Sequence, residues 1–202
     1  MKQVFISLLL ALCCAGSQAA VIGFDDLPGD GNGVIASGYQ GFDWSGMGVI
    51  GADVYPESGF AAGVVSPVNG AFNHGGATVT ISKAGGFDFI GAWFTSAWYE
   101  QELSFEGSRN GELLYWTDVS FVIDTVTPAW IALGWLGIDT LTIYNSSGTQ
   151  WMMDDFTVSD TAPGTVPEPG TLALLGLAMA GWMASRRPPH GRPGERAAAQ
   201  AA

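Results

Sequence analysis

The chain is predicted to fold as an all-β, jelly-roll-like β-sandwich, followed by a linker and one short C-terminal transmembrane helix. Between residues 21 and 158 no apolar stripe recurs with the 3.6-residue period of an amphipathic helix. Instead, short runs rich in β-branched and aromatic residues are separated by Gly, Asn and Pro. These runs recur roughly every ten residues, a spacing typical of β-sandwiches.

The predicted strands cover residues 21–27, 48–55, 60–66, 77–83, 87–94, 103–106, 113–116, 119–125, 129–133, 140–144 and 152–158. Asn110-Gly111 lies between two of these runs and predicts a β-hairpin, because a type I′ turn needs a positive φ at both central residues. Leu141 and Ile143 alternate with polar neighbours, which indicates a strand with one face turned toward the core.

The N-terminus has the features of a secretory signal peptide. Lys2 supplies the positive charge, an apolar run follows, and residues 17–19 (Ser-Gln-Ala) form a small-x-small cleavage site. We expect residues 1–19 to be removed. Both cysteines, Cys13 and Cys14, lie in this segment, so the mature chain is expected to have no disulfide and no thiolate nucleophile or ligand.

A second apolar segment, residues 171–185, lies near the C-terminus and contains no charge. As a helix it would be about 22 Å long, which is short for a bilayer core of about 30 Å. Pro169 is compatible with a helix start, and Arg186 and Arg187 would stay on the cytoplasmic side. A buried core helix is the alternative, but such a helix normally has a polar face and this segment has none.

Pro167-Glu168-Pro169, the short apolar helix and the pair Arg186-Arg187 together resemble a PEP-CTERM sorting signal. Such signals occur in Gram-negative bacteria that make exopolysaccharide. The resemblance implies recognition by an exosortase, a membrane transpeptidase that cuts near the Pro-Glu-Pro and releases the exported protein or attaches it elsewhere.

The chain is thus divided into five parts. The signal peptide (1–19) precedes a β-sandwich cargo domain (20–159), a linker (160–166) rich in Pro, Thr and Gly, and the sorting segment with its transmembrane helix (167–187). The tail, residues 188–202, runs past the arginines where members of the family usually stop. It has no apolar periodicity and is expected to be disordered and cytoplasmic.

The predicted domain is strongly acidic. Between residues 20 and 165 the only basic residues are Lys83 and Arg109, against 17 Asp and Glu, so the net charge is 2 − 17 = −15. Such a field repels phosphate backbones and excludes nucleic acid as a partner. It favours cations, although acidity by itself is also what keeps an exported protein soluble.

Four short segments give the domain a family likeness: FDD at 24–26, YQGFDW at 39–44, GFDFIGAWF at 86–94 and DDF at 154–156. Together they are similar to uncharacterised β-sandwich cargo domains joined to such sorting signals, and more distantly to galactose-binding-like jelly rolls.

Two pairs of aspartates suggest a structural Ca²⁺ site. Asp25 and Asp26 lie in the first predicted strand and Asp154 and Asp155 in the last, and in many jelly rolls these strands are neighbours. Ca²⁺ takes six to eight oxygen ligands, many of them carboxylates. The alternative is that the four side chains point into solvent at strand ends.

A glycan-binding surface is the second candidate site. Seven of the eight tryptophans lie in the domain, and Trp98 and Tyr99, beside Glu100, are expected in an exposed loop. There an indole ring can stack on a sugar while the carboxylate accepts hydrogen bonds. The other tryptophans considered, Trp93, Trp116 and Trp130, are predicted to fill the core.

Catalysis is not expected. The domain has one histidine, His74, and lacks a G-x-S-x-G nucleophile elbow. We therefore predict a non-enzymatic, exported cell-surface or exopolysaccharide-matrix protein, structural or glycan-binding, that is held briefly in the inner membrane. The alternative is a secreted carbohydrate-active enzyme of the glycosidase type, with its two carboxylates drawn from Glu100, Glu102, Glu106 and Glu112.

Overall fold

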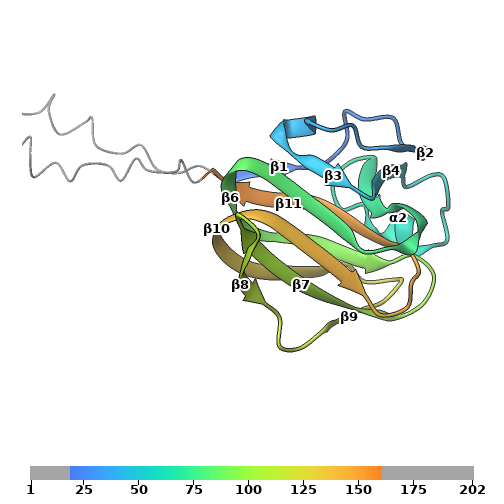
Figure 1. Ribbon diagram of the computed structural model, residues 1–202. Coiled ribbons are helices and arrows are strands. Elements are labelled where there is room, and N and C mark those ends of the chain that lie inside the picture. Colours follow the sequence, from blue (N-terminus) through green and yellow to red (C-terminus); the bar gives the residue numbers. More distant parts are fainter. Residues whose placement is uncertain (1–18, 161–202) are drawn as a thin grey trace, which may run out of the picture. The chain divides into compact units, whose positions relative to one another are not determined.

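A computed structural model describes residues 19–160, which form an antiparallel β-structure (Figure 1). The strands are β1 (Ala19–Ile22), β2 (Asp30–Val34), β3 (Asp43–Ser45), β4 (Met47–Gly51), β5 (Asn69–Asn73), β6 (Val79–Ser96), β7 (Gln101–Arg109), β8 (Glu112–Trp116), β9 (Phe121–Ile123), β10 (Ala129–Asn145) and β11 (Trp151–Ser159). The helices are the short α2 (Gly59–Gly63) and the 3-10 turns η2 (Tyr39–Gly41) and η3 (His74–Gly76).

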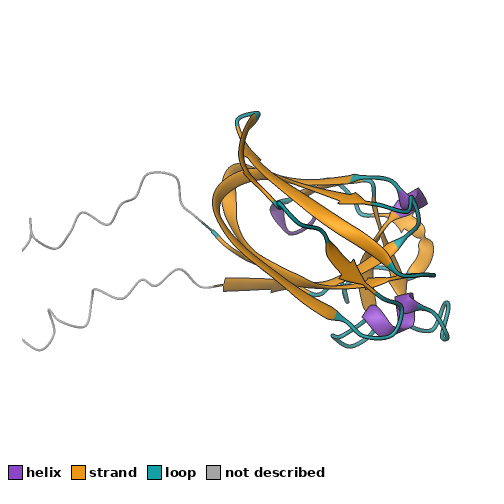
Figure 2. Cartoon of the chain, turned by 90° about the horizontal axis from the view of Figure 1, so that it is seen from below, coloured by secondary structure: helices purple, strands orange, loops and turns teal. Residues whose placement is uncertain are grey.

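The eleven strands are hydrogen-bonded in the order β2-β4-β5-β11-β6-β10-β7-β8, with β1 on β11, β3 on β6 and β9 on β7. The sheet folds over on itself because β6 and β10 belong to both layers. The first part of β6 pairs with β3 and the end of β10, and its second part pairs with β11 and the start of β10. Figure 2 shows long strands that curve at one end of the domain. The predicted β-sandwich is confirmed.

Glycines in the two long strands β6 and β10 mark bends within a strand and not turns between strands. Residues 77–83 and 87–94 were predicted as separate strands but form the continuous β6, and residues 129–133 and 140–144 form β10. Gly85 and Gly86 have φ values of 90° and 91°, and the β6–β10 pairing is interrupted by register shifts between Ala132 and Thr140. Glycine and bulges bend a strand sharply without ending it.

The strand predicted at residues 60–66 is wrong, because α2 (Gly59–Gly63) lies there. Ser58 is its N-cap, and the Ser58 side chain accepts a hydrogen bond from the Phe60 backbone N–H. Strands β2, β3 and β5 were not predicted, since their glycine-rich and polar sequences lack a β pattern. The predicted hairpin is confirmed: Asn110 and Gly111 have φ values of 51° and 78° between the paired Arg109 and Glu112.

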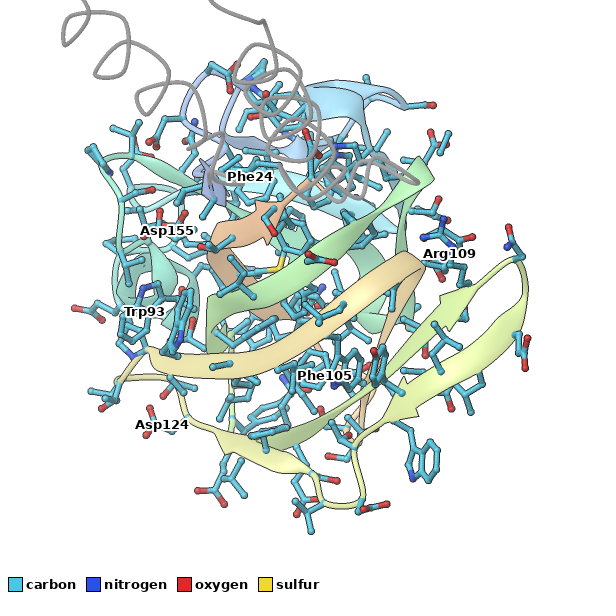
Figure 3. All side chains as sticks on the ribbon, turned by 90° about the vertical axis from the view of Figure 1, so that its left-hand side faces the viewer. Phe24, Trp93, Phe105, Arg109, Asp124 and Asp155 are labelled. Carbon is cyan, nitrogen blue, oxygen red and sulfur yellow. The ribbon has the colours of Figure 1, made fainter. Side chains whose placement is uncertain are left out.

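The core between the layers is rich in aromatic rings. Phe105 lies inside it (Figure 3) with its ring centroid 5.6 Å from that of Phe94, and Phe89 stacks on Phe156 at 5.0 Å. Asp155 has a φ of 51° at a shift in the β6–β11 register, and this bulge turns Phe156 and Val158 inward. A smaller cluster (Ile50, Phe60, Phe72, Ala97, Met152) lies under α2 on the outer side of the sheet.

Several predictions fall outside the described residues: the signal peptide, the linker beyond residue 160, the sorting segment, its transmembrane helix and the tail. Within residues 19–160, no helix is both long and apolar enough to cross a membrane. The two ends of the described part lie side by side, because Ala19 pairs with Ser159.

Candidate functional site

The predicted glycan-binding residues lie together in the loop between β6 and β7. Trp98 and Tyr99 are 43% and 65% exposed, and Glu100 is also exposed. The Trp98 indole N–H donates to Gln150 Oε1 over 3.0 Å, and its ring meets Tyr55 edge-on at a centroid distance of 5.4 Å. The indole is therefore held in place while much of its surface faces solvent.

Trp98 lines a cavity of about 410 Å³ with the segment that precedes α2. We name this cavity the loop pocket; its lining residues are Val54, Tyr55, Pro56, Glu57, Ser58 and Trp98. It combines two aromatic rings with a carboxylate and a hydroxyl, which is the composition of a small-molecule site with a few orienting polar groups. The sequence gives no sign of Tyr55 as a site residue, because its contact with Trp98 exists only in the folded chain.

A second hollow lies on the outer face of the sheet formed by β7, β8 and β10. It has a volume of about 370 Å³, and we name it the sheet-face groove; its lining residues are Ser104, Phe105, Glu106, Leu113, Trp116, Thr117 and Tyr144. Trp116 is 60% exposed, so its predicted place in the core is wrong.

Trp116 is exposed because the β7–β8 hairpin contains a bulge. Ser108 pairs with Leu113 but Gly107 pairs with Tyr115, which leaves Leu114 as an extra residue in β8. A bulge exchanges the two faces of the strand beyond it. Trp116 therefore lies opposite the outward-facing Glu106 instead of the buried Phe105.

Hydrogen bonds fix the polar groups of the sheet-face groove. The Tyr144 hydroxyl donates to Glu106 Oε2 over 2.8 Å, and the Trp116 indole N–H donates to Asp118 Oδ1 over 2.7 Å. The hydrogen bond to Glu106, helped by partial burial and the negative charge of that carboxylate, raises the pKa of Tyr144. Tyr144 thus stays protonated as a donor, and the second oxygen of Glu106 is left to accept other donors.

The other tryptophans predicted in the core also differ from expectation. Trp130 is 39% exposed, and Trp93 is half-buried with its ring centroid 5.5 Å from that of Trp130. Trp93 lies on the same side of the molecule as Asp155, away from Arg109 (Figure 3).

Asp154 is completely buried on the outer side of β11, and its carboxylate is fully engaged by donors. Val65 N–H and Ser66 N–H donate to Oδ2 over 2.8 Å each, Asp155 N–H donates to Oδ1 over 2.7 Å, and the Ser66 hydroxyl reaches both oxygens at 3.0 Å. Burial raises the pKa of Asp154, and these donors oppose the rise only in part. The carboxylate fastens the segment after α2 onto the sheet.

Of the other predicted calcium ligands, Asp25 and Asp26 lie near the start of the domain and Asp155 lies in β11. Asp25 and Asp26 are exposed; Asp25 Oδ1 accepts from Asn69 N–H over 3.1 Å, and Asp26 Oδ1 accepts from the Tyr39 hydroxyl over 2.6 Å. Burial, followed by the negative charge of Asp25, raises the pKa of Asp155. No group of three or more His, Cys, Asp or Glu within residues 19–160 is arranged to hold a metal ion. Calcium binding stays a prediction, tested below.

The sorting residues Pro167, Glu168, Pro169, Arg186 and Arg187 lie outside the described residues. Residues 165–187 match the sequence profile of the PEP-CTERM protein-sorting motif. The C-terminal segment is thus a sorting motif, which indicates export and surface sorting in a bacterium.

Comparison with solved structures finds distant β-sandwich likenesses. The tandem CBM22-1–CBM22-2 domains of Paenibacillus barcinonensis Xyn10C align with a TM-score of 0.44 and 12% identity, over 78% of this chain and 50% of theirs. The chain thus spans about half of that tandem structure. The CBM22-1 xylan-binding domain of the same protein aligns with a TM-score of 0.43 and 12% identity, over 72% of this chain and 97% of that domain.

TmCBM61, solved in complex with β-1,4-galactotriose, aligns with a TM-score of 0.33 and 11% identity, over 68% of this chain and 97% of its own. These likenesses are too distant to assign a ligand to this chain. No curated protein sequence matches it.

Proposed function

We propose that this protein is an exported component of the cell surface or exopolysaccharide matrix of a Gram-negative bacterium, with a glycan-binding β-sandwich. The observation that carries the proposal is the PEP-CTERM sorting motif at 165–187 behind a domain that presents the loop pocket. An exosortase-like transpeptidase would process the chain while its C-terminal segment is held in the inner membrane.

The loop pocket supplies the chemistry for glycan recognition. Trp98 offers an aromatic surface whose orientation is fixed by Gln150 and Tyr55, so little side-chain entropy is lost when a sugar stacks on it. The Glu57 carboxylate lines the same cavity and is suited to accept from hydroxyl groups of the sugar. Tyr99 and Glu100, exposed beside Trp98, extend the surface.

The binding proposal is tested with the purified full chain in detergent on an immobilised glycan panel. We expect retention on at least one glycan and its loss, by about tenfold or more in affinity, on Trp98→Ala. Trp130→Ala is the matched control, because Trp130 is similarly exposed at 39% but lies outside the loop pocket. Equal retention of both variants would contradict the loop pocket as the site.

The melting temperature of the purified full chain, measured in calcium and in EDTA, tests the calcium prediction. Bound Ca²⁺ stabilises the folded state by mass action, so saturating calcium would raise the melting temperature and chelation would lower it. Calcium bound by Asp25, Asp26, Asp154 and Asp155 predicts that Asp25→Asn, which removes one of these carboxylates, reduces or abolishes this shift. An identical melting temperature in calcium and in EDTA would refute the calcium prediction.

The sorting proposal is tested in the producing cell. Replacing Pro167-Glu168-Pro169 by three alanines should leave full-length protein in the membrane fraction, because the transpeptidase loses its recognition element. Pro163→Ala, in the linker outside the motif, should be processed like the wild type. Normal processing of the triple variant would refute sorting through this motif.

A further inference from the structure

We propose that the sheet-face groove is a second glycan-binding site, separate from the loop pocket and selective for an uncharged polysaccharide. It rests on the proposed function, since both sites serve binding to surface or matrix glycans. The two hollows share no lining residue: one is built mainly from the β7, β8 and β10 strands, and the other from the segment before α2 together with Trp98, which follows β6.

The groove opens onto a row of outward-facing polar side chains that crosses the sheet. Trp116 pairs with Glu106, Glu106 with Thr142, Thr142 with Thr80 and Thr80 with Ser45. Neighbouring strands lie about 4.8 Å apart, so this row presents a binding group at a regular interval over five strands. A parallel row runs beside it through Ser108, Thr140 and Ser82. Regularly spaced hydroxyls, together with the carboxylate of Glu106, suit the repeating hydroxyl groups of a polysaccharide lying across the strands.

Trp116 is positioned to stack on a sugar ring at one end of this row. Its indole N–H is already paired with Asp118 Oδ1, which fixes the ring plane, and 60% of the side chain is exposed. Leu113 and Tyr144 line the groove with it. An exposed indole held in place by a hydrogen bond is pre-organised for stacking, because binding costs little further rotamer entropy.

Glu106 lies beside Trp116 and supplies the groove with a hydrogen-bond acceptor. Its Oε2 accepts from the Tyr144 hydroxyl, and its Oε1 is left to accept sugar hydroxyls. The hydroxyls of Ser104 and Thr117 line the same groove and can donate or accept. The groove therefore matches a ligand that offers both apolar ring faces and hydroxyl donors, which distinguishes a glycan from a purely apolar partner.

The charge of the domain selects an uncharged glycan. Within residues 20–165 there are two basic and 17 acidic side chains, and neither basic side chain lines the groove. Lys83 is paired with Asp160 at 2.5 Å, and Arg109 donates to the backbone carbonyls of Gly137 and Gly85. A polysaccharide of uronic acids would bring carboxylates next to Glu106 without a compensating cation, and would be repelled.

The test uses affinity gel electrophoresis of the full chain in detergent with four neutral polysaccharides (xylan, glucomannan, galactan and β-glucan) and with polygalacturonate. The proteins are wild type, Trp116→Ala, Trp98→Ala and the double variant. We expect at least one neutral polysaccharide to retard Trp98→Ala. The affinity of the double variant for that polysaccharide should be lower by about tenfold or more. Polygalacturonate should retard none of them.

Glu106→Gln guards against a folding artefact, since it keeps the size of the side chain and an acceptor for Tyr144 while removing the charge. It should weaken retardation by the neutral polysaccharide with an unchanged melting temperature. If Trp98→Ala alone abolishes all retardation, the second site is wrong and the loop pocket stands. Stronger retardation by polygalacturonate overturns the selectivity, and no retardation of the wild type overturns both sites.

A protein partner for the groove is the remaining outcome. Because β8 is an edge strand of the sheet, a second copy of the chain could pair along it. Sedimentation of the wild type and Trp116→Ala distinguishes the two cases. A dimer that becomes monomeric in Trp116→Ala, with polysaccharide retardation unchanged, would overturn the proposal.

Discussion

The two outer faces of the sandwich differ in how far they are covered by the rest of the chain. On the covered face, over β5, β11 and the end of β6, α2 and the segment after it are packed onto the sheet, with Asp154 buried beneath them. On the open face, over β3, β10, β7 and β8, the sheet presents Trp116 and rows of hydroxyls. In Figure 1, α2 lies near β4, whereas β7, β8 and β9 lie together on the lower side.

The contrast predicts that substitutions on the two faces affect stability to different degrees. Side chains on the covered face are engaged by partners within the chain, and their loss leaves buried groups unpaired. Side chains on the open face are partly exposed and make few contacts, so changing them is expected to alter binding while leaving the fold intact. The predictions below test this difference.

The largest effect is expected from Asp154→Ala. Removal of the carboxylate leaves the N–H groups of Val65, Ser66 and Asp155 and the Ser66 hydroxyl without their acceptor in a buried place. We expect a loss of about 3 kcal/mol or more in the free energy of unfolding, measured by denaturant titration. Asp53→Ala, at an exposed aspartate, is the control and should stay within about 0.5 kcal/mol. Equal losses would show that Asp154 does not hold the covering segment.

A smaller loss is expected from Gly59→Ala at the start of α2. A Cβ atom there would lie 1.6 Å from the Ser96 carbonyl oxygen, a backbone atom that cannot move aside. Overpacking of this kind costs about 1 to 3 kcal/mol, so the melting temperature should fall. Gly33→Ala has no atom within 4 Å of the added Cβ and should melt like the wild type. An unchanged melting temperature for Gly59→Ala would mean that α2 is not tightly packed on β6.

The two layers of the sandwich show how much of the fold the sequence alone could predict. Alternation identified Leu141 and Ile143 as inward residues of β10, and the β-rich runs separated by turn residues predicted the all-β class. These patterns could not show that Gly85 and Gly86 bend one strand instead of separating two, because glycine has the same backbone freedom in a turn and in a bend. The layers of the sandwich therefore had to come from the three-dimensional pairing.

Trp116 illustrates the same limit at the candidate site. The Asn110-Gly111 turn was readable, and extending its register regularly would place Trp116 opposite Phe105, inside the core. One extra residue, Leu114, reverses this orientation. No turn signal marks that bulge, so the sheet-face groove could not be predicted, whereas the loop position of Trp98 could.

Asp155→Asn is expected to have a modest effect that depends on pH. Burial and the nearby Asp25 raise the pKa of Asp155, so its contribution to stability is full below the unfolded pKa of about 3.9 and is lost as the pH rises through the folded pKa. Asparagine tolerates the φ of 51°. At pH 7 the free energy of unfolding of the variant should be higher by a few tenths of a kcal/mol, after allowance for solvent screening. Its free energy of unfolding should also depend less on pH between 4 and 7 than that of the wild type.

Asp124→Asn is the control of opposite sign. Thr127 N–H and Val126 N–H donate to Asp124 Oδ1 over 2.7 Å each and lower the pKa of that carboxyl. Its contribution is therefore present above the unfolded pKa and lost on acidification, so the variant should be less stable at pH 7. Urea titrations at pH 4, 5, 6 and 7 measure both variants. The same sign for the two would contradict the assigned environments.

The smallest effect on stability is expected from Trp116→Ala, although tryptophan is the largest side chain. A tryptophan buried in the core would cost about 3 to 5 kcal/mol on truncation to alanine, which is what the unbulged register predicts. With 60% of the side chain exposed and the indole bonded only to the exposed Asp118, we expect a loss below about 0.5 kcal/mol. Denaturant titration distinguishes the two values readily. A loss of several kcal/mol would mean that Trp116 is packed in the core, whereas a small loss would agree with its exposed position.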